Sequence, residues 1–196
     1  MKILIKMKLL LLLLLQVPLL ANCQIESRFI ADEEISGIRF YDSISVLTKC
    51  PMINKIWDGR HDSLSPMPMV KFYNKDSTEL LTLILHPGSY RNNFAEFDVA
   101  KSQKSNIKHS IHYLPEKTFH SESGIKLGLT KADVIKLKGN SYKLIIENGN
   151  EILSYKVSIN DGSYVILNKY SMPEYFARYI FNKNRLIEFK FGFTYP

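Results

Sequence analysis

The chain has 196 residues, 45% of them hydrophobic, which is enough to bury one sizeable core. Three of its 26 Lys and Arg residues fall within the first eight positions, and without them 23 basic residues face 19 acidic ones, a net charge of about +4. This mild excess is spread along the chain without a long basic run, which argues against nucleic acid as a partner.

The N-terminus has the pattern of a secretory signal peptide. Three lysines precede an almost unbroken apolar run at residues 9–20. The run is shorter than the roughly twenty residues that a membrane-spanning helix needs, and Pro18 interrupts it. We therefore predict that residues 1–23 are a signal peptide and that residues 24–196 form a single exported domain, periplasmic or secreted.

The end of this signal has two interpretations. Small side chains at Ala21 and Cys23 suit cleavage before Gln24, which releases a soluble protein. Residues 20–23 also resemble the box at which bacterial lipoproteins are acylated, and Cys23 would then carry the lipid of an outer-membrane lipoprotein. Asn22 departs from that box, in which Gly, Ala or Ser usually precedes the cysteine. Association with a membrane is expected only if Cys23 is lipidated.

Cys50 is the second of the two cysteines, so a mature chain that has lost or acylated Cys23 has no internal disulfide. An unpaired thiol can act as a nucleophile, and Cys50 is one candidate group for an alternative function as a small periplasmic hydrolase. A small buried hydrophobic residue is the competing interpretation.

The first half of the mature chain, residues 36–100, contains strand patterns. Residues 70–74 and 80–85 flank a polar turn, and residues 94–99 alternate between apolar and polar side chains. Upstream of these strands, a polar cluster surrounds a glycine and consists of Asp58, Arg60, His61 and Asp62. An acid and a histidine together can transfer protons, but consecutive turn residues more commonly cap and solvate a bend.

The polar residues 100–117 predict a linker or exposed loop between the two halves. In and beside this segment, His109, His112 and His120 lie close in sequence, with Glu116 among them. Three imidazoles can hold zinc, which supports a metal-binding protein or hydrolase as the alternative function. Solvated surface is the competing interpretation, because a loop gives metal ligands little rigid support.

The strongest local pattern predicts a short helix that starts after Thr130. Thr130 can cap its N-terminus, with Asp133 completing a capping box and Leu129 packing on Val134 as a hydrophobic staple. Two lysines fall in the last turn, and Gly139 can adopt the left-handed conformation that often ends helices.

Two hairpins follow the helix. Residues 142–147 and 152–158 flank an Asn-Gly-Asn turn, and residues 175–181 and 186–193 flank a loop at 182–185. The last strand has two distinct faces, one polar and one formed by Ile187, Phe189, Phe191 and Phe193. This alternation predicts an antiparallel sheet with one buried face.

Tyrosines are candidates for a binding face, because each pairs an apolar ring with a hydrogen-bonding hydroxyl. Those of the second half are Tyr164, Tyr170, Tyr175, Tyr179 and Tyr195. Packing within the core and the sheet is the alternative role for each of them.

The two halves resemble each other weakly, which suggests related modules at about 36–100 and 123–196. Residues 36–40 match residues 123–127, and the same offset places Ser43 on Thr130 and Leu47 on Val134. Pro51 makes a helix after Ser43 harder to extend.

Residues 123–193, with their capped helix, tyrosine-containing hairpins and two-faced last strand, resemble the outer-membrane assembly lipoproteins of the SmpA/OmlA type and the beta-lactamase-inhibitor-protein-like fold. The resemblance implies helices on one face of an antiparallel sheet and a binding role in the cell envelope, and it transfers no functional residue. Asn140 departs from the proline usual after the helix.

We therefore predict an α+β protein, an antiparallel sheet with helices packed on one face and two related helix-plus-hairpin modules. Strong catalytic and cofactor motifs are absent from the sequence, so we predict no cofactor and a non-catalytic protein. The expected function is binding of a protein or another component of the envelope, with the partner and the oligomeric state left open.

Overall fold

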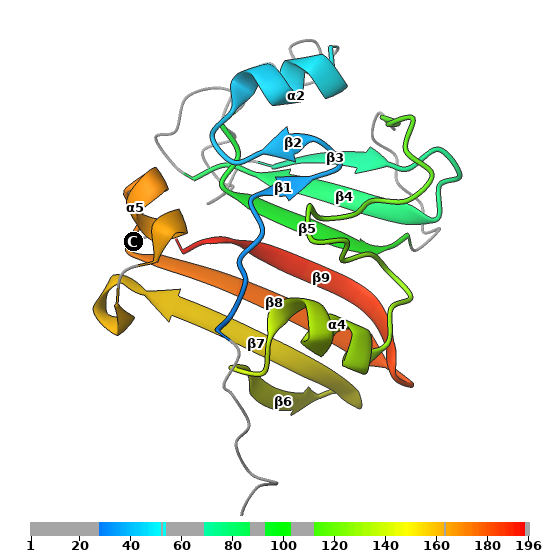
Figure 1. Ribbon diagram of the computed structural model, residues 1–196. Helices are drawn as coiled ribbons and strands as arrows, with labels where there is room; N and C mark the ends of the chain where they lie inside the picture. Colours follow the sequence, from blue (N-terminus) through cyan, green and yellow to red (C-terminus); the bar gives the residue numbers. More distant parts are fainter. Residues whose placement is uncertain are drawn as a thin grey trace, which may run out of the picture.

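The computed structural model describes residues 28–51, 53, 69–86, 93–102, 112–162 and 164–194 (Figure 1). The predicted signal peptide with Cys23, the polar cluster at residues 58–62, and His109 lie outside the described residues. Within the described ranges, no helix combines the length and the hydrophobicity needed to cross a membrane.

A seven-stranded antiparallel sheet forms most of the structure, in the order β3-β4-β5-β9-β8-β7-β6. Its strands are β3 (Met69–Tyr73), β4 (Glu79–Ile84), β5 (Glu96–Lys101), β6 (Lys143–Glu147), β7 (Asn150–Ser158), β8 (Glu174–Asn182) and β9 (Arg185–Phe193). β1 (Glu34–Ile35) and β2 (Ile38–Arg39) form a separate two-stranded sheet. Because β5 pairs with β9, strands from both halves of the chain join in one sheet.

The helices of the described residues are short, and the predicted α+β class with helices packed on one face of the sheet is wrong. The α-helices are α2 (Ser43–Lys49), α4 (Lys131–Lys138) and α5 (Val165–Tyr170), so the protein is mostly β. Extended segments, rather than helices, cover much of the buried face of the large sheet. Figure 1 shows the N-terminal segment and the β1-β2 sheet in front of the large sheet, and Phe29, Ile35, Phe119 and Ile125 are buried there.

The covered face of the sheet is apolar because its strands alternate between buried and exposed side chains. The buried side chains that these strands turn toward the core include Leu81, Leu83, Phe97, Val99, Leu153, Tyr155, Val157, Tyr175, Ala177, Tyr179, Phe181, Leu186, Phe189, Phe191 and Phe193. Phe40, which follows β2, stacks on Phe97 with ring centroids 4.6 Å apart. Burying one such aromatic side chain stabilises the fold by roughly 1.5–3 kcal/mol.

α4 confirms the predicted helix. The Thr130 hydroxyl accepts a hydrogen bond from the Asp133 N–H, and the Asp133 carboxylate accepts one from the Thr130 N–H, at 3.2 and 3.1 Å. Gly139 follows the helix with a φ of 87°. α4 buries Val134 as expected, but its last residue, Lys138, is also fully buried.

Both predicted hairpins are confirmed, with one difference in the last strand. The β8-β9 turn is shorter than the predicted loop at 182–185, with positive φ angles at Lys183 and Asn184. A bulge follows it, because Phe181 pairs with Leu186 whereas Ile180 pairs with Glu188. The prediction that Ile187 points to the buried face is therefore wrong, and Leu186 takes that place.

The first half partly follows the predicted match with the second. Gly37 and Gly124 have nearly equal φ angles of 89° and 88°, and the isoleucine after each is fully buried. α2, however, is capped by Asp42 and buries Val46, each one residue before the positions that the match predicts. The predicted polar loop at 100–117 is wrong at its start, because residues 100 and 101 belong to β5. Its other described part, from residue 112, lies beside β3, where Leu114 is buried.

Candidate functional site

The face of the large sheet that points away from the core, here called the open face, carries a polar row across its strands. The register pairs Lys71 with Thr82, Thr82 with Asp98, Asp98 with Lys190, and Lys190 with Arg178. Directly opposite side chains lie about 5 Å apart, so neighbours in the row interact. Lys71 is exposed, and Asp98, Lys190 and Arg178 are partly exposed.

Asp98 has a strongly perturbed carboxyl group at the centre of this row. Burial, together with the negative charge of Glu188, raises the pKa of Asp98 to about 6, although Lys190 and Lys71 act in the opposite direction. Its Oδ1 atom is buried and has no hydrogen-bond partner among the described residues. The group can therefore donate or accept a hydrogen bond near pH 6, and its charge changes there.

Glu96, on the same strand, is instead held as a carboxylate. Burial opposes its ionisation, but hydrogen bonds from His86 and Lys190 outweigh that effect and keep the pKa of Glu96 below its ordinary value. The Lys190 ammonium lies 2.8 Å from the Glu96 carboxylate. His86 Nε2 also lies 2.9 Å from the Phe193 carbonyl oxygen, so Glu96 and His86 are fixed within the sheet.

Apolar and cationic groups adjoin the row on β8. Phe176 and Ile180 are partly exposed on the open face, on either side of Arg178. The Lys190 ammonium lies 5.6 Å from the centre of the Phe176 ring. The Arg178 side chain is 44% exposed and pairs loosely with Glu147 at 3.5 Å, whereas its Nε atom is buried and has no partner among the described residues. The open face thus offers a partner an aromatic ring and a guanidinium edge.

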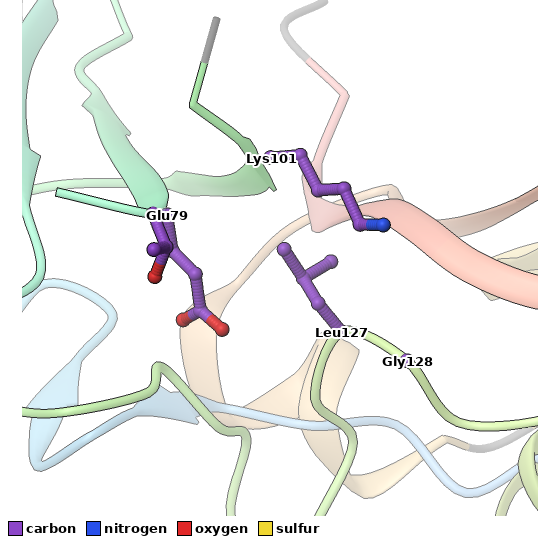
Figure 2. A pocket seen from close by; sticks show the side chains of 5 residues that line it. Glu79, Lys101, Leu127 and Gly128 are labelled. Carbon is purple, nitrogen blue, oxygen red and sulfur yellow. The ribbon is translucent and has the colours of Figure 1, made fainter. Parts of the chain in front are cut away.

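A hollow of about 280 Å³ lies at the end of β4 and β5, against Leu127 and Gly128 (Figure 2). The Glu79 carboxylate in its wall accepts hydrogen bonds from the Thr118 hydroxyl at 2.5 Å and the Phe119 N–H at 2.6 Å. Glu79 therefore fastens the segment before α4 to the sheet, and this role occupies both oxygens of the carboxylate.

A polar cluster inside the protein joins the N-terminal segment to α4. Lys138 forms an ion pair with Asp32, and both residues are at most 1% exposed. Lys138 also donates to the Ile30 carbonyl at 3.0 Å, and the Ser123 N–H donates to Asp32 at 3.2 Å. Burial lowers the pKa of Lys138, while Asp32 acts in the opposite direction. Because this polar cluster is buried in the core, we assign it a structural role.

The candidate tyrosines fall into two groups. Tyr175 and Tyr179 are fully buried in the core, where Tyr175 donates to the Asp32 carbonyl at 2.9 Å. Tyr164 and Tyr170 are partly exposed, and Tyr195 lies outside the described residues. The tyrosines of β8 therefore serve packing, and the open face takes its aromatic ring from Phe176.

Cys50 lies at the end of α2 as a free thiol, 4% exposed. Burial, followed by the nearby negative charge of Glu116, raises the pKa of the Cys50 thiol to about 12. The thiolate is the nucleophilic form, so this thiol is poorly suited to catalysis at neutral pH.

The candidate zinc ligands contact different elements. The His112 carbonyl accepts a hydrogen bond from the N–H of Tyr73, the last residue of β3. The His120 ring instead lies 3.2 Å from the Ser36 hydroxyl. Glu116 pairs with Lys49 of α2 at 3.0 Å. Across the part of the chain that the structure describes, no three His, Cys, Asp or Glu side chains gather as a metal site.

The chain matches no protein-family model, no curated protein and no solved structure. The structure itself must therefore indicate the site. In the sequence, one pattern indicated the polar row of the open face, namely the polar side of the last strand with Glu188 and Lys190. The pairing of Lys190 with Asp98 and Arg178 could not be predicted, because it depends on the order of the strands in the sheet.

Proposed function

We propose that this chain is an exported, non-catalytic binding protein of the cell envelope, which recognises a folded protein through its open face. The observation that carries the proposal is the combination of Phe176, Ile180 and Arg178 beside the polar row of Asp98 and Lys190. Aromatic and arginine side chains are enriched in protein interfaces and provide most of their binding energy.

The charges of the open face favour a protein partner. Lys190 is balanced by Glu96 and Arg178 by Glu147, so the face presents both signs rather than a basic field. A mixed surface of this kind selects a partner by complementary charge, whereas nucleic acid or an anionic membrane requires a concentrated excess of basic groups.

Two hollows lined by described residues are smaller than typical small-molecule pockets. Their volumes are about 280 and about 240 Å³, below the roughly 300–1,000 Å³ of typical ligand pockets. Export rests on the signal pattern at residues 1–23, and the envelope on the resemblance of residues 123–193 to assembly lipoproteins and inhibitor modules.

Site-specific photo-crosslinking in cells tests this proposal. Phe176 is replaced by the photoreactive benzoylphenylalanine on the open face, and Lys136, exposed on α4 on the opposite side of the sheet, is replaced in a control. We expect position 176 to give one discrete adduct with a single envelope protein. Position 136 should give none.

A second substitution links that adduct to the face. Arg178→Glu should abolish crosslinking from position 176, because it reverses the charge beside the ring, whereas Lys136→Glu should leave it intact. Equal adducts from both positions, or an adduct that survives Arg178→Glu, would refute recognition through the open face.

A further inference from the structure

Among the described residues, β6 is a free edge of the large sheet. It is the last strand in the order and has β7 as its neighbour, as Figure 1 shows at the lower end of the sheet. The opposite edge, β3, is partly occupied, because Tyr73 exchanges backbone hydrogen bonds with His112 and Leu114 at 2.8 and 2.9 Å. A free edge presents unpaired backbone groups to which another strand can bind.

The side chains of β6 are unusually apolar for an exposed strand. Leu144 is 49% exposed and Ile146 is 65% exposed, on the side of the strand that continues the core face. Charged residues, Lys143 and Glu147, stand at the two ends of the strand. The edge therefore has an apolar centre between one positive and one negative end.

The hairpin turn determines which backbone groups are free. Asn148 and Gly149 both have positive φ angles, 51° and 75°, as in a two-residue type I′ turn. In such a hairpin Glu147 and Asn150 form a hydrogen-bonded pair, and so do Ile145 and its partner on β7. The N–H and C=O groups of Leu144 and Ile146 therefore point outward, away from β7.

We propose that two copies of this chain associate through β6, paired antiparallel about Ile145, so that one sheet continues through both. In this register Leu144 lies opposite Ile146 of the partner subunit, and each such pair exchanges both of its outward N–H···O bonds. Lys143 lies opposite Glu147 of the partner subunit, and the symmetry repeats every contact.

The charges specify this register. A shift of two residues in either direction keeps the hydrogen-bonding alternation but removes both Lys143–Glu147 pairs and leaves apolar side chains without a partner. Opposite charges across neighbouring strands stabilise a pairing, and like charges destabilise it. The short strand buries less surface than a standard interface, so we expect a dissociation constant on the order of micromolar.

Charge reversal in the exported chain, followed by sedimentation equilibrium, tests the proposal. Lys143→Glu and Glu147→Lys each place like charges opposite one another in both of the symmetry-related 143–147 pairs. Each should raise the dissociation constant of the dimer about tenfold or more. The double variant Lys143→Glu/Glu147→Lys restores both attractive pairs and should recover the dimer. Both positions are exposed in the monomer, so the substitutions leave the core unchanged.

A backbone variant provides an independent measurement. Ile146→Pro removes an outward N–H but no bond to β7, and edge strands tolerate proline at such positions. We expect a monomer with an unchanged circular dichroism spectrum. A wild-type chain that remains monomeric up to about 500 µM, two orders of magnitude above the expected constant, or a dimer indifferent to the charge reversals, would overturn the proposal. Crosslinking at Phe176 reports on the open face separately.

Discussion

Lys138→Met isolates the energetic role of the buried ion pair in the core. Lys138 and Asp32 are at most 1% exposed, and Asp32 is held in place by the Ser123 N–H and by its own backbone contacts with Tyr175. Methionine keeps most of the length and apolar volume of lysine but removes the ammonium. The Asp32 carboxylate then remains buried without its cation.

Removing one member of a buried ion pair costs about 3–5 kcal/mol, because the remaining charge is left without compensation. For a protein of this size, each kcal/mol lowers the melting temperature by about 2–4 °C, so we expect a fall of roughly 6–20 °C. The double variant Lys138→Met/Asp32→Asn should recover part of this loss, because no unpaired charge remains.

Urea unfolding followed by intrinsic fluorescence measures these differences, and Lys136 provides the control. Lys136 lies in the same last turn of α4 but is exposed, so Lys136→Met should change the free energy of unfolding by less than about 0.5 kcal/mol. Equal losses for Lys136→Met and Lys138→Met would refute the reasoning, since burial is the main difference between the two positions.

Three further predictions concern single residues. The pKa of Asp98, about 6 in the folded chain, lies above its ordinary 3.8, so its favourable contribution to stability is present below pH 3.8 and disappears as the pH rises through 6. Asp98→Asn should therefore be more stable than wild type at pH 7.5 but not at pH 4 in urea unfolding, and an equal difference at both would contradict this. Cys50 should react with a thiol reagent slowly in the native protein and rapidly in denaturant, because its thiol is buried with a pKa of about 12. Gly192→Ala should lower stability by about 1–3 kcal/mol in thermal unfolding, because its Cβ would lie 2.4 Å from the Ala95 carbonyl oxygen.

Local patterns in the sequence predicted local structure well. Thr130, Asp133 and Gly139 act within one helix, and the capping bonds that they predict depend on residues three positions apart. The turn at Asn148 and Gly149 is likewise determined by neighbouring backbone conformations. These features need no knowledge of distant parts of the chain, and the structure confirms them.

The fold class required information that local patterns do not carry. The predicted helices exist, but they do not cover the sheet alone. Residues in extended segments, such as Phe29, Ile38 and Phe119, also bury their side chains against it. No periodicity marks such segments, because each contributes isolated apolar side chains rather than a face. Ile187 illustrates the same limit, since a bulge changes the face of a strand without changing its composition.

The candidate site was predictable only in part for the same reason. Lys138 has the sequence position of a helix-ending surface lysine, and its burial follows from Asp32, more than a hundred residues away. Asp98 and Arg178 come from different halves of the chain and share a row only because β5 and β8 both pair with β9. His112 and His120, close in sequence, instead contact separate elements.

The open face and the β6 edge meet at Lys143, which connects the two proposals. Lys143 continues the polar row, because it pairs with Ser154 on β7, which pairs with Arg178 on β8. A dimer through β6 would therefore join the polar rows of both copies across the two-fold axis. A partner bound near Arg178 could then contact both subunits, so dimerisation should strengthen recognition. If Lys143→Glu/Glu147→Lys restores both the dimer and the crosslink at Phe176 while Lys143→Glu weakens both, the two surfaces act together. Crosslinking that is indifferent to these substitutions would show that each monomer recognises its partner alone.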